Sequence, residues 1–201
     1  MVHNRQFDLT LILENIHDPY NIGAILRSCD AAGIQEVYVL YTEEGLLQNE
    51  EIEIGRRTAM GTQKWMDVHL FTDLPACIQA VRSKYQYLYS THLDAEATTL
   101  YELDLRQSVA LLFGNEHNGL SRDLLAHSDG NFCIPQFGMS KSLNVSVACA
   151  VSVFEAMRQR ITAGRYDGNH LKDQTKRASL LADYLRRHES EYDGKVIRKK
   201  D

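Results

Sequence analysis

Short apolar runs alternate along the chain with segments whose apolar residues recur every three or four positions. The short runs are rich in β-branched and aromatic residues, and they predict strands at Leu9–Leu13, Val37–Leu40, Tyr87–Thr91, Val109–Phe113 and Asn131–Ile134. The segments between them predict helices at Asn21–Ala32, Leu74–Arg82 and Leu120–Ala126. This alternation is typical of an α/β domain with a mostly parallel sheet flanked by helices. Ligands of such sheets bind beyond the carboxyl ends of the strands, so the residues after each run are the candidate functional positions.

Two longer helical patterns follow these elements. A three-to-four spacing over Ser142–Arg160 predicts a long amphipathic helix with one buried stripe, made of Leu143, Val147, Ala150, Phe154 and Met157. Beyond Gly164, a second helix is predicted near Leu171–Arg187, with an apolar side made of Leu180, Leu181, Tyr184 and Leu185. We expect it to dock on the body of the protein or on a partner subunit. The chain is therefore divided into a domain over 1–166 and a helical C-terminal extension with a tail over 167–201.

Charge is distributed unevenly between these two parts. The chain has 22 Lys and Arg residues against 27 Asp and Glu, a net charge of -5. Residues 158–201 hold 12 of the basic and 7 of the acidic residues, so this stretch carries +5 and the residues before it carry -10. A basic appendage on an acidic body is typical of proteins that bind nucleic-acid phosphates, although a solvated tail explains the charge equally well.

Composition limits the remaining possibilities. With 201 residues, 44% of them hydrophobic, the chain has the size of one globular domain with a full core. No apolar run approaches the length of a membrane span and no signal peptide is evident, so we expect a cytoplasmic protein without a membrane partner. The spacing of the four cysteines favours neither disulfides nor a metal site, and we expect small buried apolar residues at Cys29, Cys77, Cys133 and Cys149.

Three polar segments lie where a predicted strand ends or a predicted helix begins. The first segment covers Asn15–Asp30, in which Asn21 alone would be read as a helix N-cap. Arg27 lies six residues further along the same helix, among apolar neighbours. A buried or cleft-facing guanidinium needs an anionic partner, which would be either Asp30 or a phosphate from outside the chain.

The second and third segments follow later strands. Phe113–Ser121 contains two glycines, which let the backbone approach a ligand closely, and Glu116 between them can accept hydrogen bonds. Ile134–Ala148 joins a predicted strand to the long helix, with Ser142 and Asn144 at the start of that helix. Taken singly, the second segment is explained by an ordinary loop and the third by helix capping.

Together, the three segments resemble the signature motifs of the SPOUT superfamily, in the TrmH-like branch of RNA ribose 2'-O-methyltransferases. The matching stretches are Asn21–Arg27, Phe113–Leu120 and Ile134–Ala148, and the run Gly-Met-Ser-Lys-Ser-Leu-Asn-Val-Ser-Val-Ala in the third is highly specific. The resemblance extends from about Asp8 to Tyr166. It implies a SPOUT-type α/β fold with a deep trefoil knot over about 110–160, and a homodimer in which the knotted helices pack together.

The resemblance also implies an activity, the transfer of a methyl group from S-adenosylmethionine to a ribose 2'-hydroxyl of RNA, with a D-loop guanosine of tRNA as the expected target and no metal required. The positions that match the family's binding residues for the methyl donor are Thr91, Leu93, Gly114, Glu116, Ile134, Met139, Ser142 and Leu143. The implied catalytic residues are Arg27, Asn21, Glu116, Ser142 and Asn144, and those expected to contact RNA are Arg158, Arg160 and Arg165. Because a guanidinium keeps its proton, we expect Arg27 to stabilise a developing alkoxide and to hold phosphate.

One departure from the family keeps the substrate open. The family's tRNA guanosine methylases usually begin with a basic helical extension, whereas here about eight residues with a single Arg5 precede the first strand. The same chemistry on a tRNA wobble nucleotide or on ribosomal RNA is therefore an alternative. A non-catalytic knot-fold module that binds RNA or the cofactor is the alternative from another class, and the intact motif residues disfavour it.

Overall fold

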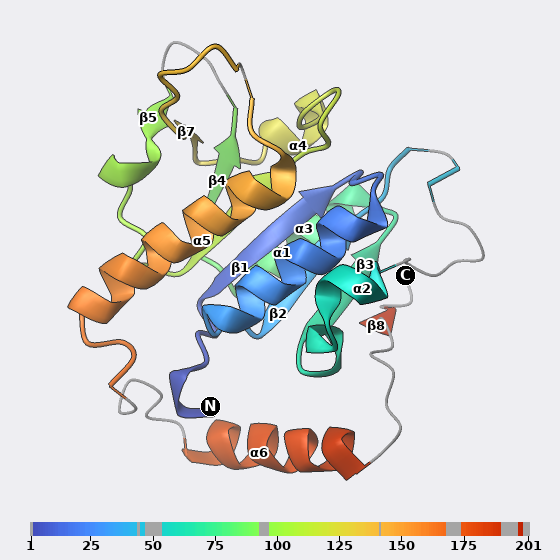
Figure 1. The fold of residues 1–201 in the computed structure, drawn as a ribbon, viewed down its shortest axis with the longest axis vertical. Coiled ribbons are helices and arrows are strands. Elements are labelled where there is room, and N and C mark those ends of the chain that lie inside the picture. The colour runs from blue at the N-terminus through green and yellow to red at the C-terminus, as the bar shows by residue number, and fades with distance from the viewer. Residues whose placement is uncertain are drawn as a thin grey trace.

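A single parallel sheet forms the centre of the computed structural model, which describes residues 2–43, 45–46, 54–92, 97–140, 142–167, 174–189 and 197–198. Within these residues the strand order is β5-β7-β4-β6-β1-β2-β3-β8, and every neighbouring pair is parallel (Figure 1). The strands are β1 Leu9–Glu14, β2 Glu36–Leu40, β3 Asp67–Phe71, β4 Tyr87–Thr91, β5 Thr98–Thr99, β6 Val109–Phe113, β7 Gly130–Cys133 and β8 Ile197–Arg198. Because all strands run the same way, their carboxyl ends lie along one edge of the sheet.

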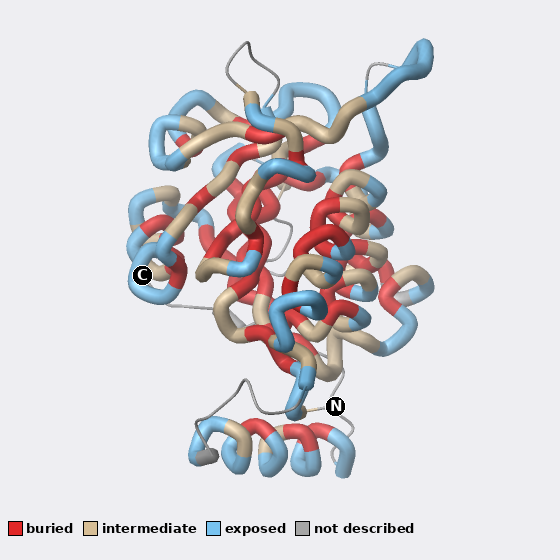
Figure 2. Tube along the Cα trace, turned by 90° about the vertical axis from the view of Figure 1, so that its left-hand side faces the viewer, coloured by how far each residue is buried: buried red, intermediate tan, exposed pale blue. Residues whose placement is uncertain are grey.

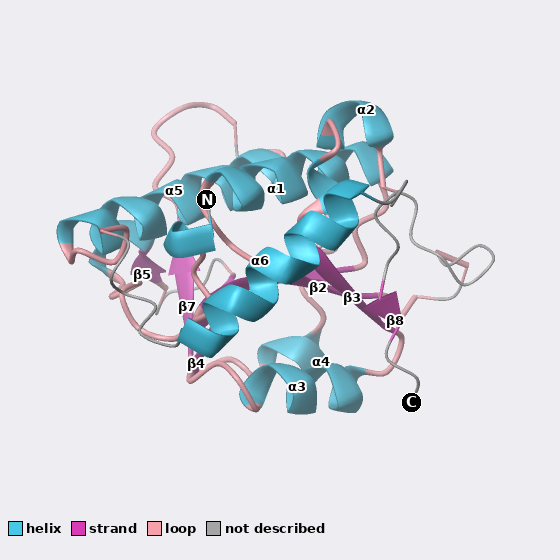
Figure 3. Cartoon of the chain, turned by 90° about the horizontal axis from the view of Figure 1, so that it is seen from below, coloured by secondary structure: helices cyan, strands magenta, loops and turns pink. Residues whose placement is uncertain are grey.

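Helices cover both faces of this sheet. On one face lie α1 Pro19–Ala31, α2 Arg56–Ala59 and α5 Val145–Thr162, and on the other lie α3 Leu74–Arg82 and α4 Arg122–Leu125 (Figure 3). Helix α6, Gln174–Glu189, crosses below the amino ends of the strands (Figures 1 and 3). Three short 3-10 helices complete the described elements, at Val2–Asn4, Thr62–Lys64 and Leu100–Glu102.

The core consists of two apolar clusters, one on each face of the sheet. Strand β1 is completely buried and contributes to both, with Leu11 and Leu13 facing the cluster that α1 and α5 cover and Ile12 facing the cluster at α3. Figure 2 shows that the buried residues concentrate in these central layers. A strand buried on both faces reads as a continuous apolar run, which is why β1 and β6 are easy to predict.

All five predicted strands are present, to within one residue at each end, but β3, β5 and β8 are not predicted. Strand β3 is not predicted because the polar residues Asp67 and His69 interrupt its apolar pattern. The imidazole Nε2 of His69 lies 3.0 Å from an oxygen of Glu36, which also accepts a hydrogen bond from Lys84. Burial would raise the pKa of Glu36, but these partners outweigh it and hold that pKa well below its usual range.

The start of α1 differs from the predicted one. The N-cap is Asp18, whose carboxylate accepts a hydrogen bond from Tyr20 N at 2.8 Å. The interpretation of Asn21 as a cap is therefore wrong, because Asn21 lies inside the helix and is buried. Its side chain is consequently available for a role other than capping.

Helix α5 buries a different face from the one that its spacing predicts. The predicted stripe includes Val147 and Phe154, which are 46% and 44% exposed. The buried residues are instead Val145, Cys149, Ser152, Val153, Glu155, Ala156 and Arg160. Both faces of the helix carry apolar side chains, so periodicity alone could not choose between them.

Helix α6 packs on the body through part of its predicted apolar side. Tyr184 is buried, its hydroxyl donates to Gln35 Oε1 at 2.6 Å, and its ring lies edge-on to Trp65. Leu180 is buried too, whereas Leu181 and Leu185 are about half exposed. Two of the four residues predicted on the apolar side are therefore buried, and the prediction is wrong for the other two. Leu171, where this helix was expected to begin, lies outside the described residues, and a domain boundary at residue 166 stays a prediction. Within the described ranges, no helix combines the length and the apolarity needed to cross a bilayer.

The cysteines are free thiols, and three of the four are buried. Burial raises the pKa of Cys29 and Cys149 well above the usual range of a thiol, and that of Cys77 to about 12. Cys133 is half-buried. Cys29, Cys77 and Cys149 therefore pack as small apolar groups, as the sequence indicates.

Candidate functional site

A cavity of about 280 Å³ opens at the carboxyl ends of β4, β6 and β7. Residues of the second and third polar segments line this cavity, and the first segment is joined to both through the side chain of Asn21, because the loops after parallel strands share one edge. Six of the eight residues expected to bind the methyl donor line the cavity, namely Thr91, Gly114, Glu116, Ile134, Ser142 and Leu143. Other residues that line the cavity are not among the predicted ones, for example Asn115, Gln136, Phe113, Phe132, Val145 and Ala148. Asn115 follows a glycine directly after a buried strand, and a polar residue at that position could have been predicted to line a ligand site.

The loop after β6 folds back on itself to form one wall. Asn115 Oδ1 accepts hydrogen bonds from the backbone N–H groups of His117 at 3.0 Å and Asn118 at 2.7 Å. Gly119 has a φ of 68°, in the left-handed region that favours glycine. A Cβ atom at Gly114 would lie 2.0 Å from the carbonyl carbon of Gly119, so only glycine fits there. The two glycines of the motif are therefore required by the backbone of the loop.

Replacing Gly114 by alanine should push the backbone at Gly114 away from the backbone at Gly119 and deform the cavity wall. Because the clash is with backbone atoms, we expect affinity for S-adenosylmethionine to fall at least about tenfold, with a lower melting temperature. Calorimetric titration and thermal unfolding measure both quantities. Gly130→Ala is the matched control, since its Cβ would meet only the Tyr89 ring at an ordinary 3.5 Å. Unchanged affinity in Gly114→Ala would contradict this account of the wall.

A hydrogen-bonded series of amide and carboxylate side chains joins the three segments beside the cavity. Asn21 donates from Nδ2 to Glu116, and its Oδ1 accepts from Asn144 Nδ2 at 3.1 Å. Asn144 is also the N-cap of α5, since its Oδ1 accepts from Ser146 N at 2.8 Å. The capping role predicted for Asn144 is therefore present together with its contact to Asn21. Three of the expected catalytic residues are thereby fixed relative to one another.

Arg27 lies apart from these hydrogen-bonded side chains. It lies six positions after Asn21, a rise of about 9 Å along α1. Its side chain is exposed, does not line the cavity, and donates from Nη1 to Met60 Sδ at 3.3 Å. Asp30 forms its ion pair with Arg5 at 2.5 Å. Of the two anionic partners that the sequence allows for Arg27, Asp30 is therefore not the one it pairs with, and a phosphate from outside the chain stays a prediction.

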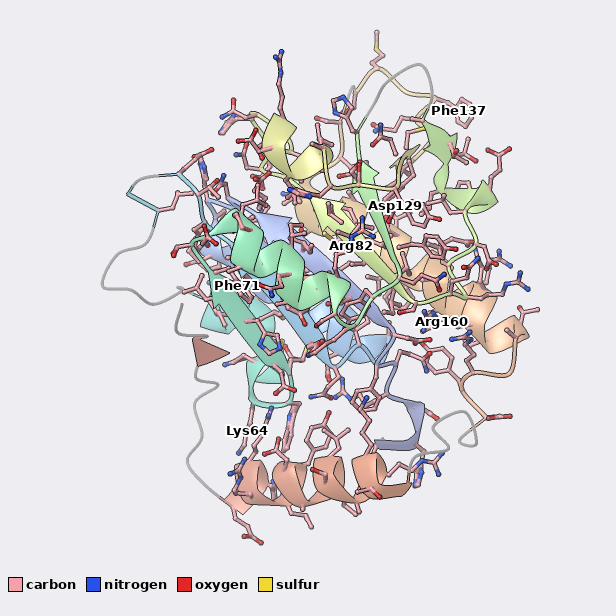
Figure 4. All side chains as sticks on the ribbon, turned by 180° about the vertical axis from the view of Figure 1, so that it is seen from behind. Lys64, Phe71, Arg82, Asp129, Phe137 and Arg160 are labelled. Carbon is pink, nitrogen blue, oxygen red and sulfur yellow. The ribbon has the colours of Figure 1, made fainter. Side chains whose placement is uncertain are left out.

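One further donor-binding candidate, Met139, does not contribute to the cavity lining. Met139 is fully exposed on the loop before α5, close in sequence to Phe137, which is 99% exposed and projects from the same loop (Figure 4). The structure therefore places Met139 outside the cavity, although the family match assigns it to the donor. Leu93 lies outside the described residues.

The three arginines expected to contact RNA differ sharply in exposure. Arg160 is completely buried near the carboxyl end of α5 (Figure 4) and donates to Asp8, Gln6, Leu105 O and Gln107 O. Its guanidinium is occupied inside the fold, so the expectation that Arg160 contacts RNA is wrong. Arg158 is 65% exposed and pairs with Glu155, which lies in the next turn of the helix. Arg165 is about three-quarters buried and pairs with Asp8 at 2.5 Å.

Known proteins resemble this chain over nearly its whole length. It is 40% identical over 187 residues to the tRNA (guanosine(18)-2'-O)-methyltransferase of Thermus thermophilus, with 93% of each chain covered. The A. aeolicus TrmH/SpoU tRNA modifying enzyme superposes with a TM-score of 0.79 at 27% identity, covering 92% of this chain and 91% of that one.

A second solved structure includes the cofactor. The SpoU methyltransferase AviRb from Streptomyces viridochromogenes, in complex with AdoMet, matches with a TM-score of 0.67 at 26% identity, covering 79% of this chain and 62% of that one. The sequence model of the SpoU rRNA Methylase family matches residues 8–154, well over half of the chain. The chain therefore belongs to the SpoU methylase family.

Proposed function

We propose that this protein transfers a methyl group from S-adenosylmethionine to a ribose 2'-hydroxyl of RNA, and that a D-loop guanosine of tRNA is the target. The observation that carries the proposal is the hydrogen-bonded series of Asn21, Glu116 and Asn144, which joins three family motifs next to one cavity, lined by Glu116. The target rests on the 40% identity to a tRNA guanosine-18 methylase over 93% of both chains.

The cavity has the chemistry that the methyl donor requires. Apolar side chains such as Ile134 and Leu143 can pack against the adenine, while Glu116 and Ser142 offer polar contacts. The close approach at Gly114 keeps side chains out of the wall where a ligand would meet the backbone. When bound, the donor supplies an electrophilic methyl group on a sulfonium. The residues of this chain must then position the ribose oxygen and stabilise its charge.

A ribose hydroxyl is a poor nucleophile, so its oxygen has to be placed accurately and its developing negative charge has to be stabilised. The hydrogen-bonded Asn21, Glu116 and Asn144 form a preorganised frame for that placement. Arg27 acts as an electrostatic clamp on the alkoxide and on a neighbouring RNA phosphate. Its guanidinium keeps its own proton, so the hydroxyl proton leaves to the phosphate or to water.

We propose further that the protein is a homodimer and that the partner's Arg27 completes each cavity. The supporting observation is an apolar stripe on the outer face of α5, in which Val147, Phe154 and Ile161 recur every seven residues at 44–53% exposure. An exposed apolar stripe of this kind is typical of a subunit interface. Arg27 lies on the neighbouring α1 outside its own cavity, where a partner's cavity could receive it. The deep trefoil knot over about 110–160 is part of the same proposal.

Mixed dimers test this arrangement. Arg27→Ala and Ser142→Trp should each be inactive alone, but mixed dimers of the two co-expressed chains should recover about half of the wild-type activity, because each mixed dimer has one intact site of two. Activity per dimer is measured after purification of both chains through different tags. If every site used Arg27 from its own chain, no mixed dimer would contain an intact site and no activity would return.

Of the three arginines expected to contact RNA outside the active site, we retain Arg158 and Arg165, since Arg160 is buried. Both lie near the carboxyl end of α5, where the two subunits of the proposed dimer would bring two such pairs together. Their ion pairs with Glu155 and Asp8 would have to compete with phosphate. We therefore expect RNA binding to weaken steeply as salt increases.

Ribosomal RNA is the second candidate substrate, because the matching family model is described as a family of rRNA methylases. The deciding experiment incubates the protein with labelled S-adenosylmethionine and separate pools of unmethylated tRNA and ribosomal RNA. The modified ribose is then located by its resistance to alkaline cleavage. Label at the D-loop guanosine supports the proposal, label in ribosomal RNA replaces the target, and no label in any RNA contradicts the activity.

A further inference from the structure

Residues 54–65, the clasp, pack over the first half of α1. The hydroxyl of Thr58 donates to Tyr20 O at 2.9 Å. A Cβ atom at Gly23 would lie 2.4 Å from Thr58 Oγ1 and 2.6 Å from Gly55 O, so the helix and the clasp touch at glycine. This close packing fixes the clasp relative to the helix that carries Arg27.

Met60, at the turn of the clasp, has a backbone conformation that methionine rarely adopts. Its φ is 48°, and Gly61 after it has a φ of 84°. Within the described ranges, Asn15 is the one other non-glycine residue with a positive φ. The Met60 side chain is 68% exposed, so burial of apolar surface does not explain why it is there. A strained residue without a packing role indicates a functional constraint.

The side chain of Met60 meets Arg27. Arg27 Nη1 donates to the Met60 sulfur at 3.3 Å. A thioether is a weak acceptor, so it can orient the guanidinium without neutralising its charge. A carboxylate in the same place would form a strong ion pair and would compete with the RNA phosphate for Arg27. The uncharged partner suits an arginine that has to remain available to an anionic substrate.

We propose that Met60 is a positioning residue, which holds the guanidinium of Arg27 in the orientation needed for methyl transfer and leaves its charge free for RNA. This inference rests on the proposed function, in which Arg27 stabilises the ribose alkoxide. Met60 and Arg27 belong to the same chain, so the clasp and α1 would present them together to the partner's cavity.

Three variants at this position separate orientation from charge. Met60→Ala removes the contact, and we expect the single-turnover rate to fall about tenfold with donor affinity unchanged. Met60→Leu keeps the bulk but lacks the sulfur acceptor, and its rate should fall several-fold. Met60→Glu should reduce the rate most, by about a hundredfold, because its carboxylate would pair with Arg27. Gln79→Glu, which adds the same charge to an exposed position of α3, is the matched control and should keep the wild-type rate.

A second readout does not depend on activity. Phenylglyoxal modifies exposed arginines, and peptide mass spectrometry gives the modification rate of Arg27 itself. We expect Arg27 to react several-fold faster in Met60→Ala than in the wild type. An unchanged reactivity, or a wild-type turnover rate in Met60→Ala or Met60→Leu, would overturn the inference. A wild-type protein that transfers no methyl group to RNA would instead overturn the proposed function, and the reactivity of Arg27 would still test the contact.

Discussion

Replacing Arg27 by alanine is expected to lower the single-turnover rate of methyl transfer by roughly two to three orders of magnitude, as for other groups that stabilise charge in a transition state. Donor affinity should barely change, because the proposed contacts of Arg27 are to the ribose oxygen and the RNA phosphate and not to the donor. The melting temperature should also stay within about one degree, because the side chain is exposed and Asp30 pairs with Arg5 instead. Rapid-quench assays, calorimetry and thermal unfolding on one preparation measure all three quantities.

Arg27→Lys separates charge from geometry. Lysine keeps the positive charge but lacks the planar fork that can hold an alkoxide and a phosphate at once, so its turnover should stay far below that of the wild type. Near-normal turnover with lysine would reduce Arg27 to a point charge. Normal turnover with alanine would exclude Arg27 from the mechanism altogether.

The largest loss of stability is expected from Arg160→Met. The buried guanidinium donates to the carboxylate of Asp8 at 2.5 Å and to the carbonyls of Leu105 at 2.9 Å and Gln107 at 2.6 Å, so it joins α5 to the segments before β1 and β6. Its removal leaves the carbonyls of Leu105 and Gln107 without their buried donor and leaves Asp8 paired with Arg165 alone, which we expect to cost about 3–5 kcal/mol. For a chain of this size the melting temperature should fall by about 10 °C, and calorimetry measures that shift.

The neighbouring Arg158 provides the control for that loss. It is 65% exposed and pairs with Glu155 within one turn of the same helix. Exposed pairs of this kind contribute little, so Arg158→Met should change the free energy of unfolding by less than about 1 kcal/mol. Equal losses from the two substitutions would mean that the buried hydrogen bonds of Arg160 do not stabilise the fold in the way described.

Much of the fold could be predicted because the central strands are buried on both faces. Strand β6 is entirely apolar, and β1 has only Thr10 among its apolar residues before it ends at Glu14; the parallel pairing of the two strands follows from the helices between strands. Strand β3 could not be predicted, since Asp67 and His69 look like loop residues until their partners Gln35 and Glu36 are placed beside them. Long-range pairing of polar groups leaves no local pattern in a sequence.

The candidate site could be predicted in its parts but not in its arrangement. Motif positions identified Asn21, Glu116 and Asn144, yet the hydrogen bonds that join them span up to 123 positions of sequence. The position of Arg160 in a basic stretch predicted a contact with RNA. That prediction is wrong because a count of charges does not show which side chains are buried. The apolar neighbours of Arg27 predict a buried or cleft-facing side chain, but within this chain it is exposed, because a helix turns each successive side chain by about 100° and can expose one residue among buried ones.

The first turns of α5 have a consequence for how the two subunits communicate. Val145 and Ala148 line the cavity, while Val147, between them in sequence, belongs to the exposed apolar stripe. A ligand that orders this turn would therefore order both surfaces at once, and thermodynamic linkage makes such an effect reciprocal. In the proposed dimer, S-adenosylmethionine would tighten subunit association by the same factor by which association tightens its own binding. The enzyme would then sense its own concentration through its affinity for the donor.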